Sequence, residues 1–203
     1  MENGNLYLWN VIVEERRLDH MSKVCVFFAE GYEEIEALTV VDLLRRSGID
    51  TAMVSVTGDK AVTSSHGVAV VMDSLFAETD FSETEMLVLP GGMPGTKNLE
   101  ACGPLMALVD DFYREGKYVA AICAAPSILG HRGMLKGKRA CSFPEFESHL
   151  EGAEVTRNCV EIADKVITAR GMGCAIDFGL ALVAVFRGGG AADALAEKIV
   201  YRK

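Results

Sequence analysis

The chain has 203 residues, of which half are hydrophobic and 24% are charged, so its length and composition suit one globular domain with a sizeable core. Its formal net charge of −9 disfavours nucleic acids and anionic membrane surfaces, because phosphate groups require a basic protein face. No apolar run reaches the roughly 18 residues that a membrane-spanning helix needs. We therefore expect neither a nucleic-acid partner nor a membrane partner.

The six cysteines predict free thiols rather than a disulfide framework. Cys159 and Cys174 are the closest pair in sequence, and they are 15 positions apart, so the chain has no CxxC motif of a zinc or redox site. An even number of cysteines is weak support for disulfides in a chain this long and this apolar. We expect a reducing, cytoplasmic location and no metal site.

The first 20 residues differ in character from those that follow. They contain the only tryptophan, Trp9, and no turn signal connects them to the next segment. Their short apolar run is broken by Asn10 and has no basic segment before it, so it does not indicate a signal peptide. We expect residues 1–20 to be an extension outside the fold and residues 21–203 to form a single α/β domain. An arm that pairs with a partner subunit is the alternative for residues 1–20.

From residue 21 onward, apolar runs alternate with segments of helical periodicity. KVCVFF (23–28) is typical of a strand that is covered on both faces. The segment 33–48 predicts a helix, because Ile35, Leu38, Val41 and Leu44 repeat at helical spacing, acidic residues stand at its start, and arginines followed by a glycine stand at its end. A strand at 50–58 and shorter β segments within 61–71 follow.

The rest of the chain continues the alternation of strands and helices. In chain order we predict a strand at 85–90, a helix at 104–116, a strand at 118–122, a short helix at 124–133, a strand at 137–143, a hairpin at 159–170 that turns at Ala163–Asp164, and helices at 173–189 and 191–201. This order implies βαβ units and a parallel sheet between helices. Ligands of such sheets bind at the carboxyl ends of the strands, so the residues at those ends are the candidates for function.

The loop after the first strand is rich in carboxylates. The stretch AEGYEEIEA (29–37) contains Glu30, Glu33, Glu34 and Glu36. Acidic residues in a first helical turn are favoured by the helix dipole and are usually solvated, which is the simple explanation for Glu33 and Glu34. Glu36 lies where the helix turns towards the sheet, so it is the candidate functional carboxylate.

A second strand end carries paired glycines in the stretch LPGGMPGT (89–96). Glycines directly after a strand allow backbone N–H groups to point into a site, and a simple tight turn is the alternative. The order Gly95-Thr96-Lys97 does not match the end of a Walker A loop, and the stretch is not a GxGxxG motif either.

Cys123 lies where the predicted strand 118–122 ends and a helix begins. A residue at such a turn is exposed above the sheet in strained backbone geometry. The N-terminus of the following helix favours negative charge, so the reactive thiolate is favoured over the thiol. Pro126 supports the boundary, because proline is tolerated in a first helical turn. A small buried residue is the alternative for Cys123 and is our interpretation of the other five cysteines.

Five segments form a pattern that runs from Met21 to about Arg187: VFFAEGYEEIEALTVVDLLRRSGI, LVLPGGMPGTKNL, AAICAAPSILG, GMLKGKRA and ITARGMGCAIDFGLALV. Together they resemble the ThiJ/PfpI superfamily, and in particular its branch of the parkinsonism-associated protein deglycase. The resemblance implies a flavodoxin-like three-layer α/β sandwich (the class I glutamine amidotransferase-like fold), with a mostly parallel sheet and helices on both faces. It also implies a homodimer without a cofactor.

The resemblance assigns roles to individual residues. Cys123 resembles the reactive cysteine of the family, and Glu36 resembles the glutamate that contacts its sulfur. Gly92, with Gly91 beside it, and Ala124 would supply backbone donors to an oxyanion. Glu36 is expected to be protonated and to donate to the thiolate, because a closed apolar site disfavours its ionisation, and the two groups then titrate as a unit.

The chain also departs from the family pattern at positions where histidine is expected. Family peptidases carry histidine directly after the cysteine, where this chain has Ala124, so we do not expect a Cys-His peptidase. Deglycases often carry histidine where this chain has Phe143, which removes a strong general base. His66 aligns with a family arginine and is, with Phe143, a possible pocket residue. His131 is roughly 12 Å along the helix from Cys123, and His149 is expected on an exposed loop.

These residues favour a cysteine-dependent enzyme that acts on reactive carbonyls, such as methylglyoxal or its adducts, and forms a hydroxy acid. The alternative is a redox sensor or stress chaperone that uses an oxidisable Cys123 without catalysis. A role in thiazole phosphate synthesis is disfavoured, since the residues do not indicate a phosphate site.

Overall fold

The computed structural model describes residues 23–201, and the expected extension at 1–20 lies outside the described residues. The strands of this part are β1 (Val24–Phe28), β2 (Thr51–Ser55), β3 (Ala61–Thr63), β4 (Ala69–Val71), β5 (Ser74–Leu75), β6 (Met86–Leu89), β7 (Tyr118–Ile122), β8 (Arg139–Ala140), β9 (Glu154–Val155), β10 (Val160–Ala163) and β11 (Val166–Ala169). The predicted strands therefore form, although the one at 137–143 is reduced to the short β8.

The helices are α2 (Glu34–Arg46), α3 (Gly95–Ala101), α4 (Gly103–Arg114), α5 (Pro126–His131), α6 (Ala175–Arg187) and α7 (Gly189–Lys198), and short 3-10 turns are η2 (Phe76–Glu78), η3 (Pro144–His149) and η4 (Met172–Cys174). The sequence did not indicate α3, because this seven-residue helix is too short for its apolar residues to show a helical period. The predicted last helix is shifted, because α7 begins at Gly189 directly after Gly188, whose φ of 84° ends α6.

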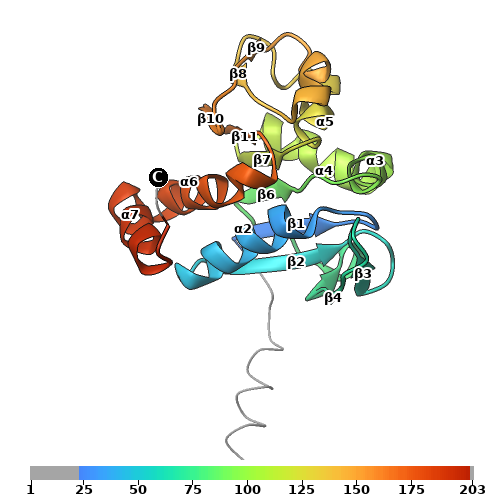
Figure 1. Ribbon diagram of the computed structural model, residues 1–203. Coiled ribbons are helices and arrows are strands. Elements are labelled where there is room, and N and C mark those ends of the chain that lie inside the picture. The colour runs from blue at the N-terminus through green and yellow to red at the C-terminus, as the bar shows by residue number, and fades with distance from the viewer. Residues whose placement is uncertain (1–22, 202–203) are drawn as a thin grey trace, which may run out of the picture.

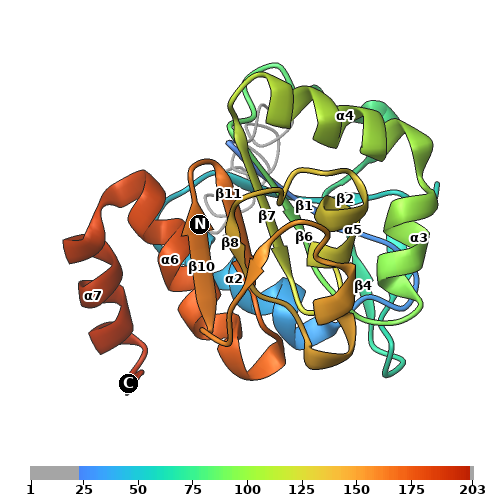
Figure 2. The ribbon, with the colours of Figure 1, turned by 90° about the horizontal axis from the view of Figure 1, so that it is seen from above.

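The predicted fold class is confirmed, since a mostly parallel seven-stranded sheet has helices on both faces (Figures 1 and 2). The strand order is β10-β11-β7-β6-β1-β2-β5, and the only antiparallel pair of this sheet is the hairpin β10–β11. The chain reverses its direction of winding between β1 and β6. In such sheets the crevice for ligands opens at the carboxyl ends of the strands at this point.

Alternation along β1 explains the two apolar layers. Val24, Val26 and Phe28 face a core with α2 and α6, while Cys25 and Phe27 face a core with α4 and α5. Each strand of the sheet centre is therefore buried on both faces, as its continuous apolar sequence indicated.

The structure corrects the expectation that all cysteines are free thiols. Cys159 and Cys174 form a disulfide with a Cα–Cα distance of 5.3 Å, which is within the usual range. The hairpin β10–β11 lies between them in sequence and returns the chain to its starting point, so a 15-residue separation becomes a contact. Four cysteines are free, namely Cys25, Cys102, Cys123 and Cys141.

Within residues 23–201, every helix is too short or too polar to cross a membrane.

Candidate active site

Cys123 occupies a strained turn between β7 and α5. Its φ of 65° lies in the left-handed region, which is uncommon for a residue with a side chain and costs of order 1–3 kcal/mol. The Cys123 N–H donates to the carbonyl of Ala169 at 3.0 Å, and its own carbonyl accepts from the Phe143 N–H at 2.8 Å. Two neighbouring segments therefore hold the residue in this conformation, with its side chain only partly buried.

Glu36 lies in the first turn of α2 and is 1% exposed. Its neighbour Ile35 is 49% exposed, which reverses the usual placement of an apolar and a charged residue. The helix therefore buries a carboxyl group where a hydrophobic side chain would be expected on its core face. An exchange of this kind costs stability and indicates that the carboxyl group has a specific role.

Glycines allow the carboxyl group of Glu36 and the side chain of Cys123 to meet. A Cβ on Gly91 would lie 2.6 Å from Glu36 Oε2 and 2.6 Å from Cys123 Cβ, so only glycine fits between them. The Gly91 N–H donates to Glu36 Oε2 at 3.0 Å, which differs from its expected role as a donor to an oxyanion. The backbone N–H groups of Ala124 and Gly92 instead lower the pKa of the Cys123 thiol.

The two titratable groups of the site compete for negative charge. Burial raises the pKa of Glu36 to about 7, against a lowering by Cys123 and by the Gly91 N–H. Burial also raises the pKa of the Cys123 thiol, and the Glu36 carboxylate raises it further, while the two backbone donors lower it. The expected thiolate therefore requires Glu36 to hold the proton, because near neutral pH the pair carries at most one negative charge.

Glu36 Oε1 is buried and has no hydrogen-bond partner by ordinary geometric limits within residues 23–201. Among the neighbouring groups, the Cys123 thiol has the largest effect on the pKa of this carboxyl. The proton of the pair can thus move between sulfur and carboxyl oxygen without breaking another protein hydrogen bond.

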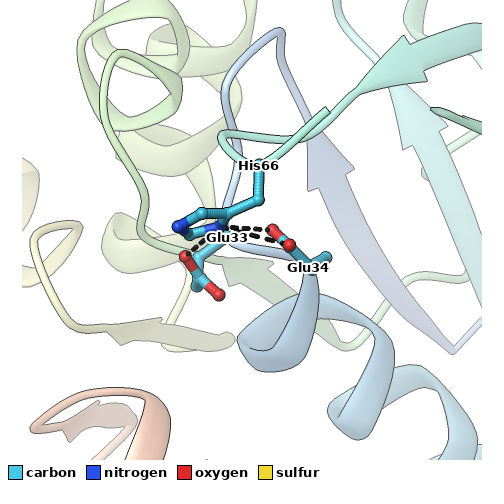
Figure 3. A group of neighbouring side chains, drawn as sticks. All are labelled: Glu33, Glu34 and His66. Atoms are coloured by element: carbon cyan, nitrogen blue, oxygen red, sulfur yellow. Dashed lines mark hydrogen bonds and ion pairs between the residues drawn. The ribbon is translucent and has the colours of Figure 1, made fainter. Parts of the chain in front are cut away.

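His66 lies beside this site and interacts with two glutamates of the α2 N-terminus (Figure 3). Its Nδ1 is 3.2 Å from the Glu34 carboxylate and 3.6 Å from Glu33 Oε2, and its side chain is 68% exposed. Glu34, and then Glu33, raise the pKa of His66. The potential ligand atoms of these three residues lie within 4.8 Å of one another, a spacing that a cation could bridge.

The other predicted positions have less direct contact with the sulfur. Phe143 meets Cys123 through its backbone, and its ring is 41% exposed next to Gly171. Burial raises the pKa values of Cys25 and Cys141 to about 11, which agrees with a structural role for both.

Sequence reasoning missed Gly31 and Gly95, which bring the two glycine-containing loops together. Gly31 has a φ of +80°, and a Cβ there would lie 2.4 Å from Pro94 Cδ. A Cβ on Gly95 would lie 2.6 Å from the Tyr32 nitrogen. A glycine in each loop can be seen in the sequence, but the residue of the other loop against which it packs cannot.

Comparisons with known proteins show which family the chain resembles. The sequence model described as the DJ-1/PfpI family matches residues 22–185. Protein DJ-1 homolog B of Arabidopsis thaliana is 37% identical over 79% of this chain, which spans only 37% of that relative. The solved structure described as oxidized DJ-1 of Toxoplasma gondii has a TM-score of 0.85 and 32% identity, and the match covers 90% of this chain and 100% of that one.

Two further relatives carry names that state an activity. A deglycase of Thermococcus kodakarensis is 34% identical over 64% of this chain and 78% of its own length. A glutathione-independent glyoxalase of Caenorhabditis elegans is 28% identical over 78% of this chain and 85% of its own length.

Substitution Gly91→Ala tests the close packing of the pair. We expect it to lower the free energy of unfolding by about 1–3 kcal/mol, because the new methyl group displaces Cys123 or Glu36. Gly103→Ala is the matched control, since a Cβ there meets nothing within 4 Å, and its stability should be unchanged or higher. Urea denaturation measures both; equal stability of the two variants would contradict the packing argument.

The raised pKa of Glu36 predicts a pH-dependent cost of folding. Between about pH 4.5 and pH 7 the folded state holds this proton and the unfolded state does not, so the free energy of unfolding falls as pH rises, by about 3 kcal/mol in total. Glu36→Gln has no such proton to lose. The free energy of unfolding of this variant minus that of the wild type should therefore increase from pH 4.5 to pH 7. Exposed Glu78→Gln should not show this gain. Denaturation curves across this range would oppose the prediction if the difference between Glu36→Gln and wild type stayed constant.

Proposed function

The chain belongs to the DJ-1/PfpI family, and on this premise we propose that it is a cofactor-free enzyme that uses Cys123 to convert small reactive carbonyls into hydroxy acids. Its substrates would be methylglyoxal or glyoxal, or their adducts on amino and thiol groups. The observation that carries the proposal is the buried Glu36 carboxyl group next to the partly exposed Cys123 at a strained turn. Relatives named as a glyoxalase and a deglycase support the same chemistry.

The first step is addition of the Cys123 sulfur to the aldehyde carbon. Glu36 holds the thiol proton, so the sulfur attacks as a thiolate and a hemithioacetal forms. Negative charge develops on the former aldehyde oxygen, and the N–H groups of Gly92 and Ala124, which also lower the pKa of the Cys123 thiol, are its proposed donors. In comparable sites one such donor lowers the activation free energy by about 3–4 kcal/mol.

The second step moves a proton between adjacent carbons. Once Glu36 has given its proton to the oxyanion, its carboxylate removes the proton from the carbon bound to sulfur and returns it to the neighbouring carbon. The Glu36 carboxylate then carries the hydroxyl proton from the former aldehyde oxygen to the oxygen of that neighbouring carbon. The product of this transfer is a thioester of the hydroxy acid on Cys123. Water hydrolyses the thioester, releases lactate when methylglyoxal is the substrate, and regenerates the thiol. Each proton passes through Glu36, so no metal or redox cofactor is part of the proposal.

The chain lacks histidine at two positions: the one after the cysteine, where family peptidases carry it, and the one where deglycases often carry it. Ala124 follows the cysteine directly, and Phe143 occupies the other position where histidine is expected. Glu36 is therefore the proposed proton carrier of the site, and a Cys-His peptidase is not proposed. His66 is proposed to affect the pocket through Glu33 and Glu34, with which it interacts.

The cellular setting is part of the proposal as well. We propose a cytoplasmic homodimer, as the family resemblance implies. A reducing cytoplasm would keep Cys123 available as a thiol.

A redox sensor is the second candidate function. The two backbone N–H groups at the Cys123 sulfur can also stabilise oxygen atoms that are added to it. The Toxoplasma relative, whose structure is described as oxidized, gives this alternative a specific basis. Such a protein would gain oxygen at Cys123 but would not turn over carbonyls.

Lactate formation from methylglyoxal tests the proposed enzyme. We expect Cys123→Ala to reduce the rate to that of the uncatalysed reaction, because the nucleophile is lost. Glu36→Gln should reduce kcat by about 100-fold or more, since general acid–base catalysis typically contributes 10²–10⁴-fold. Cys102→Ala removes another free, partly buried thiol and should leave the rate unchanged.

A Cys123→Ala variant as fast as wild type would overturn the proposed nucleophile. Absence of turnover in the wild type, together with selective addition of oxygen to Cys123 in mild peroxide, would favour the redox sensor instead. Mass spectrometry of the Cys123 peptide measures that addition.

A further inference from the structure

One cavity of the structure lies beside α5. Its volume is about 400 Å³, and its walls come from α3, α5 and η3. Neither Cys123 nor Glu36 lines it. The polar side chains that matter below are Thr96, Glu100, His131 and His149, and all of them line this cavity.

Three of these side chains form a chain of hydrogen bonds between the three elements. His131 Nδ1 is 2.7 Å from Glu100 Oε1, and His131 Nε2 is 3.0 Å from His149 Nδ1. The two imidazole rings meet edge to face, with centroids 5.2 Å apart. The sequence suggested that His149 is an isolated exposed histidine, but the fold brings it against His131 across 18 positions.

The carboxylate determines which nitrogen of His131 is free to bind a metal. Glu100 accepts the proton of Nδ1, so the lone pair of His131 lies on Nε2 and points at His149 Nδ1. Two nitrogens in this position either share a proton or bind the same metal ion. Ligands at 2.0–2.1 Å from a tetrahedral zinc ion are about 3.3 Å apart, which is close to the distance between these nitrogens. A carboxylate on the far nitrogen of a ligating histidine is the usual support of such a site.

A buried hydroxyl group in the same cavity is an independent sign of a missing ligand. Thr96 is 2% exposed, and its Oγ1 has no hydrogen-bond partner within residues 23–201. A buried hydroxyl without a partner costs roughly 1–3 kcal/mol, so it is rarely left in this state. A water molecule bound to a metal ion in the cavity would provide that partner.

We propose that this cavity binds one divalent transition-metal ion of the zinc type through His131 Nε2 and His149 Nδ1, with water completing the coordination. Imidazole nitrogens select ions of this class over magnesium or calcium. Glu100 is a positioning residue, since it acts through His131. Binding requires only that the proton on His149 Nδ1 leaves or moves to Nε2.

Such an ion would join the two segments that hold Cys123. α5 begins just after Cys123 and ends at His131, while η3 begins just after Phe143 and ends at His149. The Phe143 N–H also donates to the Cys123 carbonyl. The metal would therefore connect the far ends of the two segments that leave the strained turn.

Titration of the tag-free protein with Zn²⁺ by calorimetry, and with Co²⁺ by visible absorption, tests the proposal. We expect one ion per chain and a Co²⁺ spectrum without thiolate charge-transfer bands, because the ligands are nitrogen and oxygen. His131→Ala and His149→Ala should weaken binding at least 10-fold. Glu100→Gln should weaken it about 10-fold, as is typical when a carboxylate behind a ligand is lost.

His66→Ala is the matched control, because His66 belongs to the cluster with Glu33 and Glu34. It should leave the affinity unchanged. Binding that survives the double substitution of His131 and His149, or that is lost in His66→Ala alone, would overturn the proposal, as would the absence of saturable binding in the wild type. Imidazole ¹⁵N spectra of the wild type, in which the His131 Nε2 signal should shift on addition of Zn²⁺, give a measurement that does not depend on whether a variant folds.

Discussion

The structure depends most on one constraint, which is that a buried carboxyl group and a thiol share a single negative charge. Burial raises the pKa of Glu36 to about 7 and also raises the pKa of Cys123, so the site cannot hold both anions at neutral pH. Backbone donors distribute the charge between them: Gly91 favours the carboxylate, whereas Gly92 and Ala124 favour the thiolate. The position of the negative charge thus depends on donors that act in opposite directions.

The fold accepts several unfavourable local features to hold this pair together. Cys123 adopts a left-handed backbone conformation, Glu36 occupies a core position of α2, and Ile35 is left exposed. Gly91 lies between the two side chains because any Cβ would displace them. Each feature costs stability by itself, and their coincidence at the carboxyl ends of adjacent strands is what a functional site predicts.

The proposed metal cavity extends this argument to the segments around the pair. α5 and η3 leave the site from Cys123 and Phe143, and they meet again where His131 contacts His149. The first site would use proton sharing between a thiol and a carboxyl group, and the second would use two adjacent imidazole nitrogens at the wall of a cavity. The two proposals are independent, since the second rests on groups that take no part in the carbonyl chemistry.

The sequence by itself determined the layers, the order of the main elements and the position of the turn at Cys123. Apolar runs of strand length and helical periodicity are local signals, and burial of those runs leaves few alternatives to a parallel sheet between helices. Only the tertiary structure decided which distant groups meet: Cys159 with Cys174, His131 with His149, and the Gly91 amide with Glu36 rather than with an oxyanion. The helix α3 also escaped detection, because its apolar face is too short to produce a period. The spacing of two residues along the chain does not show whether their side chains meet, since this depends on how each loop returns to the sheet.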